Sequence, residues 1–265
     1  MNDVRWVIQS NLGSSDEIGR LFGACEALGL EAFSVEAIPF SDELPNVPTE
    51  KAAIFYGSAK FVANAVSAGK WRPCAYFDDK IFRFSHWSEK YRGYLLNEDA
   101  ELFSMKTLAA STQWNEEDIL FFRPDRDLKE FAGQLMKFGD YKAWFKKIDA
   151  LGDESEISPD TELVVASPKS LGHEWRLFMV DGRYCSGSHY RKSGTLEVNP
   201  NVPNTVIDFA HKASEVWQPD DVYALDIGEV NGELHIVEIN GFNSTGFYAS
   251  DIQSIVAAVS SLAAG

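Results

Sequence analysis

Apolar runs and amphipathic segments alternate along the first ninety or so residues. Apolar runs of about four to eight residues are typical of strands, and an apolar stripe every three to four residues is typical of a helix. The pattern predicts a strand Val4–Gln9, a helix Ser15–Leu28 closed by Gly29, strands Glu31–Ile38 and Ala52–Tyr56, a helix Ala59–Ala68 and a strand Cys74–Phe77. Because strands and helices take turns, we expect a small parallel α/β sheet.

From about Asn97 the pattern changes, and hairpins become more frequent than strand–helix alternation. The predicted elements are a helical stretch at 105–108, a strand Ile119–Pro124, a helix Asp140–Leu151, a buried strand that ends at Pro168 and a final helix Asp251–Ala264. An acidic loop, residues 152–160, precedes the buried strand. The change of pattern predicts a domain boundary near Asn97.

Asp181-Gly182 is a strong signal for a two-residue hairpin turn. Such a turn pairs Val180 with Arg183 and places Arg176 opposite Gly187, where the missing side chain leaves room for another group. Side chains alternate between the two faces of a strand. We therefore expect a charged face with Glu174, Arg176, His189 and Arg191, and an apolar face with Trp175, Leu177, Met179 and Tyr184.

A second hairpin, with Asn231-Gly232 as its turn, carries three oxygen donors. Glu238 and Asn240 share one strand face by alternation, and Asp226 lies on the preceding strand. A simple two-residue turn sends Asp226 and Glu238 to opposite faces. A three-residue loop or an equivalent bulge brings both to one face, roughly 7 Å apart at Cβ. We predict the loop or the bulge, because carboxylate and amide oxygens suit Mg²⁺. An ordinary hairpin with solvated acids remains the alternative.

Composition limits the classes of partner. The 265 residues include 45% hydrophobic ones, enough for a sizeable core, and 40 acidic against 24 basic residues give a formal net charge of −16. Such a charge repels nucleic acid and anionic membranes, so we expect neither as a partner. An anionic ligand has to be held by a local basic cluster that overcomes the field of the whole molecule.

The three cysteines, Cys25, Cys74 and Cys185, are odd in number and far apart, which argues against a disulfide framework or a zinc site. Reduced thiols are typical of a cytoplasmic protein. The chain contains no apolar run of about 18 residues, the length of a membrane span, and its first residues lack the apolar centre of a signal peptide. We therefore expect a cytoplasmic protein.

In their order along the chain, several of these motifs resemble the ATP-grasp superfamily. They are Lys106 before a strand, the strand end F-F-R-P, the linker strand E-L-V-V-A, the hairpin motif E-W-R and the D…E-x-N hairpin. The resemblance covers residues 98–265. It implies an α+β fold in which two α+β subdomains, 98–166 and 167–265, grip a nucleotide. Residues 1–97 are then the Rossmann-like α/β domain that usually precedes the grasp.

The resemblance also implies roles for individual residues. Lys106 and Arg123 contact the nucleotide phosphates, Val165 and Ala166 offer backbone groups to adenine, and Arg176 meets the γ-phosphate or the reaction intermediate. Asp226, Glu238 and Asn240 hold Mg²⁺. Most members have Lys-Pro where this chain has Arg123-Pro124, and a glycine-rich lid where this chain has D-R-D-L-K-E-F-A-G. The chain is therefore similar to a small clade with Arg-Pro, in which Lys129 adds a phosphate contact. Arginine holds phosphate oxygens with a planar fork, unlike lysine.

The implied reaction is an ATP-dependent ligation of a carboxylate to an amine through an acyl phosphate, with ADP and phosphate as products. The substrates are a small-molecule or peptide carboxylate and amine, and the product is a modified amino acid, peptide or protein. Arg176 and Arg191 are candidates for stabilising the developing oxyanion. Two other classes stay open: a kinase that phosphorylates a small-molecule hydroxyl, and a nucleotide-binding module without catalysis. Taken singly, Lys106, Arg123 and Lys129 are equally compatible with solvated surface positions.

Overall fold

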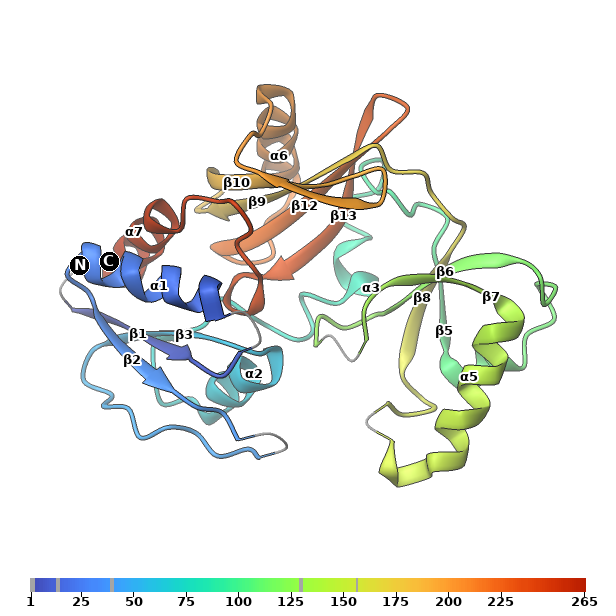
Figure 1. Ribbon diagram of the computed structural model, residues 1–265, viewed down its shortest axis with the longest axis horizontal. Helices are drawn as coiled ribbons and strands as arrows, with labels where there is room; N and C mark the ends of the chain where they lie inside the picture. The colour runs from blue at the N-terminus through green and yellow to red at the C-terminus, as the bar shows by residue number, and fades with distance from the viewer. Residues whose placement is uncertain (1–2, 13–14, 39–40, 129–130, 156) are drawn as a thin grey trace.

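The chain folds around three β-sheets. We describe a computed structural model that places residues 3–12, 15–38, 41–128, 131–155 and 157–265. A parallel sheet from the N-terminal part, a small antiparallel sheet from the middle and a larger antiparallel sheet from the C-terminal part lie in three separate regions of the molecule (Figure 1). Among the described residues, no helix is both long and apolar enough to cross a membrane.

The N-terminal sheet is parallel, as predicted. Its strands follow the order β2-β1-β3-β4, with bounds β1 Val4–Gln9, β2 Glu31–Val35, β3 Ala52–Tyr56 and β4 Pro73–Cys74, and its helices are α1 Ser15–Ala27 and α2 Ala59–Ala68. Ser58 caps α2 by accepting a hydrogen bond from the Phe61 N–H. The last predicted strand was placed too late, because the Tyr76 N–H bonds to the Asn243 side chain and not to a neighbouring strand.

The middle sheet is antiparallel in the order β5-β8-β6-β7. Its elements are β5 Glu101–Ser104, α4 Met105–Ala109, β6 Ile119–Pro124, β7 Gln134–Lys137, α5 Phe138–Leu151, the short 3-10 helix η1 Gly152–Glu154 and β8 Glu162–Ala166. One face packs against α4 and α5, where the rings of Phe122 and Tyr141 stack with centroids 4.9 Å apart. The opposite face carries Phe121 and Arg123, which alternate with the core residues along β6.

The C-terminal sheet has five antiparallel strands in the order β11-β10-β9-β12-β13. Their bounds are β9 His173–Val180, β10 Arg183–Lys192, β11 Thr195–Asn199, β12 Val222–Val230 and β13 Glu233–Gly241, and the helices of this part are α6 Asn204–Val216, the 3-10 helix η2 Phe242–Ser244 and α7 Ile252–Ala264. Helix α6 covers one face through Val206, Ala210 and Ala213. Helix α7 lies between this sheet and the N-terminal one, beside α1 (Figure 1).

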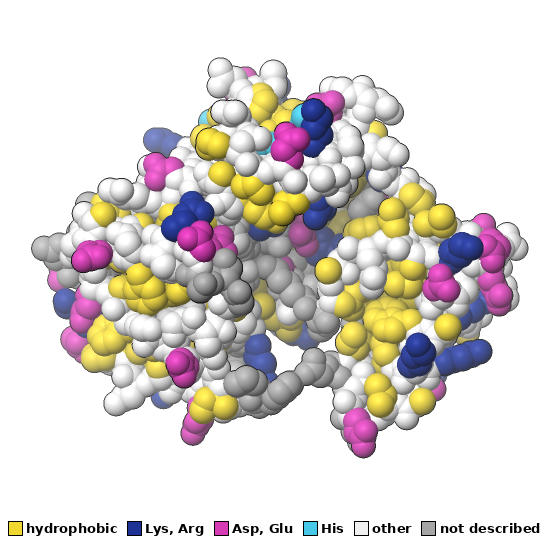
Figure 2. Space-filling model, in the orientation of Figure 1, with side chains coloured by type: hydrophobic (Ala, Val, Ile, Leu, Met, Phe, Trp, Pro, Cys, Tyr) yellow, Lys and Arg dark blue, Asp and Glu magenta, His cyan; other side chains and the backbone are white. Residues whose placement is uncertain are grey.

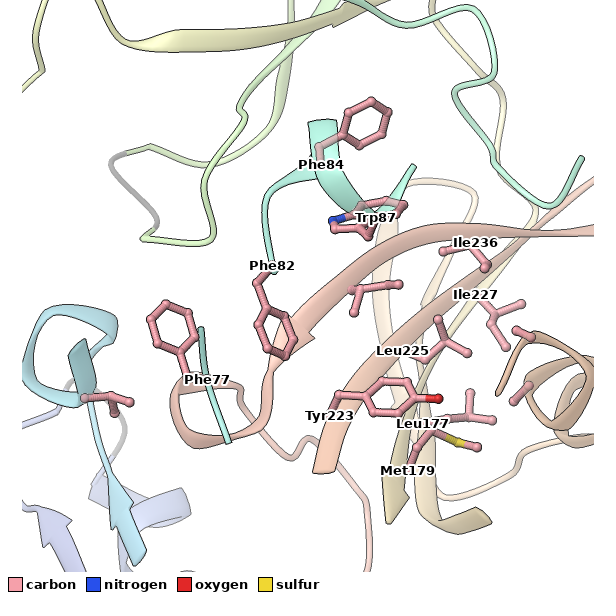
Figure 3. Close-up of a cluster of buried hydrophobic side chains, with 14 of the residues drawn as sticks. Phe77, Phe82, Phe84, Trp87, Leu177, Met179, Tyr223, Leu225, Ile227 and Ile236 are labelled. Atoms are coloured by element: carbon pink, nitrogen blue, oxygen red, sulfur yellow. The ribbon is translucent and has the colours of Figure 1, made fainter. Parts of the chain in front are cut away.

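Residues 77–95, which include the short helix α3 Phe84–Trp87, pack against the C-terminal sheet. Figure 3 shows the aromatic side chains of this segment beside strands β9, β12 and β13, with Phe77, Phe82, Trp87, Leu225, Ile227 and Ile236 among the labelled residues. Leu95 also forms a parallel bridge with Ile236. Parts of the chain on either side of Asn97 thus share one core, and the division into 1–97, 98–166 and 167–265 stays a prediction.

Candidate functional site

A cavity of about 730 Å³ lies between the middle and C-terminal sheets. Phe121, Arg123 and Leu135 line it from the middle sheet, Ser167, Lys169, Ser170 and Leu171 from the linker between the sheets, and Glu174, Arg176, Tyr190, Arg191, Asp226, Glu238 and Tyr248 from the C-terminal part. Its volume falls in the range of small-molecule sites. Four cations and three carboxylates meet there on a protein of net charge −16, and acidic side chains are scattered over the face shown in Figure 2.

A bulge brings the two predicted metal carboxylates to the same face. The turn has two residues, Asn231 and Gly232, both with positive φ, so of the two predicted alternatives the three-residue loop does not form. The register then shifts between Ile227 and Asp226, and the extra residue is Val237. Asp226 therefore pairs directly with Glu238, which confirms the predicted bulge.

A second bulge, at Cys185 in β10, corrects the register predicted for the first hairpin. Arg176 pairs with Ser188 on one side, not with Gly187, and with Asp226 on the other. A row of four paired residues, Ser188, Arg176, Asp226 and Glu238, therefore crosses the sheet from β10 to β13. Paired residues point to the same face, so the row places a cation beside two carboxylates.

His189 does not join the charged face as predicted, because the Cys185 bulge reverses its direction. It pairs with Trp175, and its ring nitrogens lie 3.0 Å from His173 Nδ1 and 3.1 Å from Asn199 Nδ2. A further bulge at Tyr190 restores the parity, so that Arg191 pairs with Glu174 and both line the cavity. The bulge also directs Tyr190 into the cavity wall, which the sequence did not indicate.

Arg176 is held on all sides. Its Nε and Nη2 atoms each donate to Asp226 over 2.7 Å, and Nη1 donates to the Gly246 carbonyl over 3.2 Å. The guanidinium carbon lies 5.1 Å from the ring centre of Tyr248 and 5.8 Å from that of Tyr190. Burial by itself lowers the pKa of Arg176, but the Asp226 carboxylate outweighs burial and the net shift is upward. This side chain therefore stays a fixed cation.

Glu174 is a buried carboxylate in the cavity wall. It accepts a hydrogen bond of 3.0 Å from the Tyr190 hydroxyl, and Arg191 Nη1 lies 3.7 Å from its other oxygen. Burial raises the pKa of Glu174, while the hydrogen bond from Tyr190 lowers it, and the net shift is upward. Tyr190, whose ring also stacks on Tyr248 at 4.9 Å, thus links Glu174 to the aromatic wall beside Arg176.

Arg123 reaches the same carboxylate row from the middle sheet. Its Nη2 atom lies 2.9 Å from Glu238 Oε1, and its Nε donates to the Pro124 carbonyl over 3.2 Å. Arg123 is buried, whereas the Glu238 side chain is 30% exposed. Arg123 and Arg176 are therefore each paired with one of the two carboxylates: Arg176 with Asp226 within the C-terminal sheet, and Arg123 with Glu238 across the boundary between the two sheets.

The donor set of the second hairpin fits Mg²⁺. Asn240 lies two residues beyond Glu238, is buried, and its amide nitrogen has no hydrogen-bond partner among the placed residues. Two carboxylates are what Mg²⁺ commonly takes from a protein when water and phosphate oxygens complete its octahedron. The described part of the chain has no cluster of three or more His, Cys, Asp or Glu side chains positioned for a metal. A Mg²⁺ ion held by Asp226, Glu238 and Asn240 would take its remaining oxygens from water or a ligand.

Three other predicted site residues, Lys106, Val165 and Ala166, lie outside the cavity lining. Lys106 is exposed at the start of α4, where its N–H donates to the Pro159 carbonyl. Lys129 lies outside the described residues. Val165 and Ala166 are buried in β8, and Val165 pairs with strands on both sides. Residues that follow them in the linker line the cavity instead: Ser167, Lys169, Ser170 and Leu171. The predicted roles of all four stay predictions.

Lys169 is a cavity cation that motif reasoning missed. Its ammonium group lies 2.6 Å from Asp99 Oδ1 and 2.8 Å from Ser167 Oγ, and Ser167 also donates to Asp99. Burial opposes ionisation of Asp99, but the hydrogen bonds from Lys169 and Ser167 are stronger and lower its pKa to about 2. This network holds the linker against Asp99. The only signal in the sequence is a lysine just after a buried strand.

Two antiparallel subdomains that face each other across a charged cavity, next to a parallel α/β sheet, define the ATP-grasp class of protein. The solved structure of the D-cycloserine synthetase DcsG shares this fold with a TM-score of 0.65 at 12% identity, over 98% of this chain and 99% of that one. Residues 102–258, more than half of the chain, match the ATP-grasp domain of the R-two-K clade, family 2, and the chain belongs to this family.

Two further structures share the fold. The D-alanine:D-alanine ligase of Bacillus anthracis has a TM-score of 0.60 and 13% identity over 97% of this chain and 92% of that one. A RimK domain ATP-grasp protein of Sphaerobacter thermophilus has a TM-score of 0.60 and 16% identity over 96% and 95%. A comparison with curated proteins finds no match. The predicted superfamily and fold are confirmed, while the significance of Arg123-Pro124 stays a prediction.

Proposed function

We propose that the protein is an ATP- and Mg²⁺-dependent ligase that joins a carboxylate to an amine through an acyl phosphate. The observation that carries the proposal is the pairing of Asp226 with Glu238 on the cavity face, beside Arg176 and Arg123. Phosphoryl transfer needs positioned charge more than covalent help from the protein. The family assignment supports the nucleotide as the ligand of this cavity.

The nucleotide lies between the two sheets in this proposal. Its base packs on the apolar wall that Phe121, Leu135 and Leu171 contribute to the cavity, near the backbone of the linker strand. Its phosphates extend toward Arg123 and Arg176, and Lys169 adds a cation at the linker. Lys106 approaches the phosphates when the middle subdomain closes. When the nucleotide binds, the ion pair between Arg123 and Glu238 breaks, and each of the two side chains contacts the ligand instead.

Asp226, Glu238 and Asn240 are the residues proposed to hold Mg²⁺. When bound, the ion neutralises the phosphate charge that develops during transfer. The Arg176 guanidinium fixes the orientation of the Asp226 carboxylate through two hydrogen bonds. Of the two carboxylates, Glu238 is the more exposed. Glu238 is therefore freer to reorient toward a ligand than Asp226.

The chemistry has two steps. A substrate carboxylate oxygen attacks the γ-phosphorus of ATP, and the bond from this phosphorus to the oxygen that bridges it to the β-phosphate breaks. ADP departs, and the substrate becomes an acyl phosphate. An amine then attacks the acyl carbon, loses a proton and expels phosphate. Arg176 and Arg191 face the cavity, where they stabilise the negative charge on the transferred phosphoryl group and on the tetrahedral oxygen.

The acceptor is an amino acid, a peptide or a protein. The D-alanine:D-alanine ligase is named for an amino acid substrate, and the ATP-grasp ligase PsnB, with a TM-score of 0.54 and 9% identity over 90% of each chain, is described in complex with a minimal precursor. The carboxylate Glu174 and the rings of Tyr190 and Tyr248 add an acidic and aromatic side to the cavity. A carboxylate and aromatic ring faces both attract a cation, so this side of the cavity favours an amine substrate that is positively charged when it binds.

The test is to measure nucleotide products with a panel of amino acids and peptides, with hydroxylamine present to trap an acyl phosphate as a hydroxamate. We expect ADP, phosphate and a hydroxamate that appear only with a substrate carboxylate, and none of them from the Glu238→Gln variant. Formation of AMP overturns the proposal. ADP with a phosphorylated hydroxyl and no hydroxamate identifies a kinase instead, and ATP binding without turnover across the panel identifies a binding module.

A further inference from the structure

Strand β11, Thr195–Asn199, is a free sheet edge. It pairs with β10 on one side, and within the described part of the chain no strand pairs with its other side. Four of its five residues are exposed, and two of them are large and apolar: Leu196 is 65% and Val198 43% exposed. An edge strand of this kind offers unpaired backbone N–H and C=O groups to another extended chain.

The two faces of β11 differ in chemistry. Leu196 pairs with Arg191, so Leu196 and Val198 point to the same side of the sheet as the main cavity. Glu197 and Asn199 point to the other side and line a second cavity of about 510 Å³. That cavity also contains Glu229, His173 and His189, and its described lining includes two glutamates but no lysine or arginine.

These faces fit a complementary strand of defined pattern. Apolar side chains of an added strand cover Leu196 and Val198, and the alternate side chains point to Glu197 and the second cavity. Basic side chains are favoured there, because Glu197 and Glu229 are the charged residues of that lining. The neighbouring cations Arg191 and Lys192 lie at the turn end of the hairpin, opposite Leu196 and Thr195. The acidic region is therefore the end of β11 near Asn199.

A second copy of the chain is a poor occupant of this edge. A two-fold dimer pairs β11 with itself in antiparallel orientation. The register that matches Leu196 with Val198 also places Glu197 directly opposite its own copy, and like charges in paired positions repel. The net charge of −16 on each chain adds to the repulsion. A basic partner removes both obstacles.

We propose that β11 binds an extended segment of a partner polypeptide in which apolar and basic residues alternate, and that this segment adds a sixth strand to the C-terminal sheet. The turn residues Ser193 and Gly194, just before β11, line the main cavity, so the bound segment runs past its mouth. The binding itself does not depend on the proposed ligase activity. A role of the segment in presenting an acceptor to the cavity does rest on it.

The test uses a fluorescein-labelled peptide of about eight alternating lysines and valines, measured by fluorescence anisotropy at about 0.15 M salt, where charges are screened beyond about 8 Å. We expect saturable binding without nucleotide. The Glu197→Lys variant should bind about fivefold or more weakly, because an attractive contact becomes repulsive. The double variant Leu196→Ser with Val198→Ser should lose a similar factor, and circular dichroism checks that both variants fold.

Matched controls separate this site from general charge attraction. Glu26→Lys, an exposed change of the same charge on α1, should leave the affinity unchanged. A peptide of the same composition with its lysines and valines in two blocks should bind clearly more weakly. Equal binding of both peptides, equal loss in Glu26→Lys and Glu197→Lys, or no binding by the parent protein overturns the proposal. The proposal is also overturned if analytical ultracentrifugation detects a dimer of the parent protein that is lost in the double variant Leu196→Ser with Val198→Ser.

Discussion

Asp226 and Glu238 are paired neighbours, but their surroundings give them different structural weights. The Asp226 side chain is 3% exposed and balances the charge of Arg176, which is itself buried. The Glu238 side chain is 30% exposed and faces Arg123 across the boundary of two sheets. Removing one partner of a fully buried ion pair leaves an uncompensated charge, and the cost is smaller where the partner that is removed is partly exposed to water, as Glu238 is. One carboxylate therefore stabilises the fold, and the other can be tested with little effect on it.

We predict that Asp226→Asn and Glu238→Gln both abolish ADP formation but differ in stability. Asp226→Asn should lower the free energy of unfolding by about 3 kcal/mol, because it leaves Arg176 buried without its counter-charge. Glu238→Gln should lower it by less than about 1 kcal/mol. Urea unfolding of the two variants measures the difference. Equal losses would contradict the roles assigned to the two pairs.

Arg123→Lys tests the arginine of the F-F-R-P strand end. The lysine keeps the charge but loses the planar fork, so ATP binding should weaken by about 1–2 kcal/mol, the value of one charge-assisted hydrogen bond. Titration calorimetry with Mg²⁺ present measures the change, and Lys146→Arg at an exposed position of α5 is the control for a neutral exchange of cations. If the Arg123→Lys variant binds as well as the parent, Arg123 acts only as a point charge.

At the scale of elements, bulges decide which side chains reach the cavity. The sequence predicted both hairpins from their Asp-Gly and Asn-Gly turns, but each bulge beyond a turn reversed the alternation, so that His189 left the predicted face and Arg191, beyond a second bulge, returned to it. The bulged positions are Cys185, Tyr190 and Val237, and none of these residue types is specific to a bulge. The need for a common metal face revealed the bulge near Val237. Without such a constraint, the bulges at Cys185 and Tyr190 could not be inferred, and His189 was misplaced.

Asp220 lies in the connection between α6 and β12. We predict that its ionisation lowers the free energy of unfolding as the pH rises. Burial raises its pKa to about 6, and the hydrogen bond from the Asp221 N–H opposes that shift. The unfolded carboxyl ionises near pH 4, so between about pH 4 and 6 the folded protein binds the extra proton and loses stability with increasing pH. Asp220→Asn should therefore stabilise the protein by up to about 2 kcal/mol at pH 8.

At pH 4 the same variant should differ little from the parent, because the Asp220 carboxyl is then largely protonated in the folded protein. Thermal unfolding of both proteins across this pH range measures the effect, and an asparagine can still accept the hydrogen bond from Asp221. Asp160→Asn, an exposed change of equal charge, controls for the net charge of the molecule. A pH-independent difference between parent and Asp220→Asn would contradict the pKa assignment.

At the scale of the whole molecule, the cavity lies between two sheets whose cores are largely distinct, with Val164 of β8 the residue of the middle sheet that belongs to the core of the C-terminal sheet. A ligand that contacts both should stabilise their arrangement. We predict that Mg²⁺ with ATP at about a hundred times its dissociation constant stabilises the protein by about 2.7 kcal/mol. The corresponding rise in melting temperature is about 2–4 °C per kcal/mol.

GTP should have a smaller effect in the same thermal scan. In the proposed site, a backbone carbonyl of the linker would accept a hydrogen bond from the adenine amino group; guanine presents an oxygen at that position, so the two acceptors would repel. ATP without any effect on melting or in titration calorimetry would contradict the nucleotide site. An equal shift with GTP would contradict recognition of the base by the linker backbone.

Much of the architecture followed from the sequence. Periodicity found β1, β3, β6 and α2 with their observed bounds, and the order of motifs led to the ATP-grasp fold. The contacts between distant segments did not follow. Nothing in the pattern of residues 77–95 indicates that they pack on the C-terminal sheet, because their aromatic residues are compatible with any apolar neighbour. Lys169 was missed for a related reason, since its partner Asp99 is distant in sequence.

Helix α7 has a consequence for synthesis of the chain. It packs against α1 and the N-terminal sheet, and Ser260 accepts a hydrogen bond from the Trp6 indole over 3.0 Å. Strand β1 thus completes its core only with residues 252–264, which are translated much later. At about 5–20 residues per second, the ribosome takes on the order of ten seconds or more to supply them. During that time the apolar face of β1 and β3 is a surface for chaperones to shield.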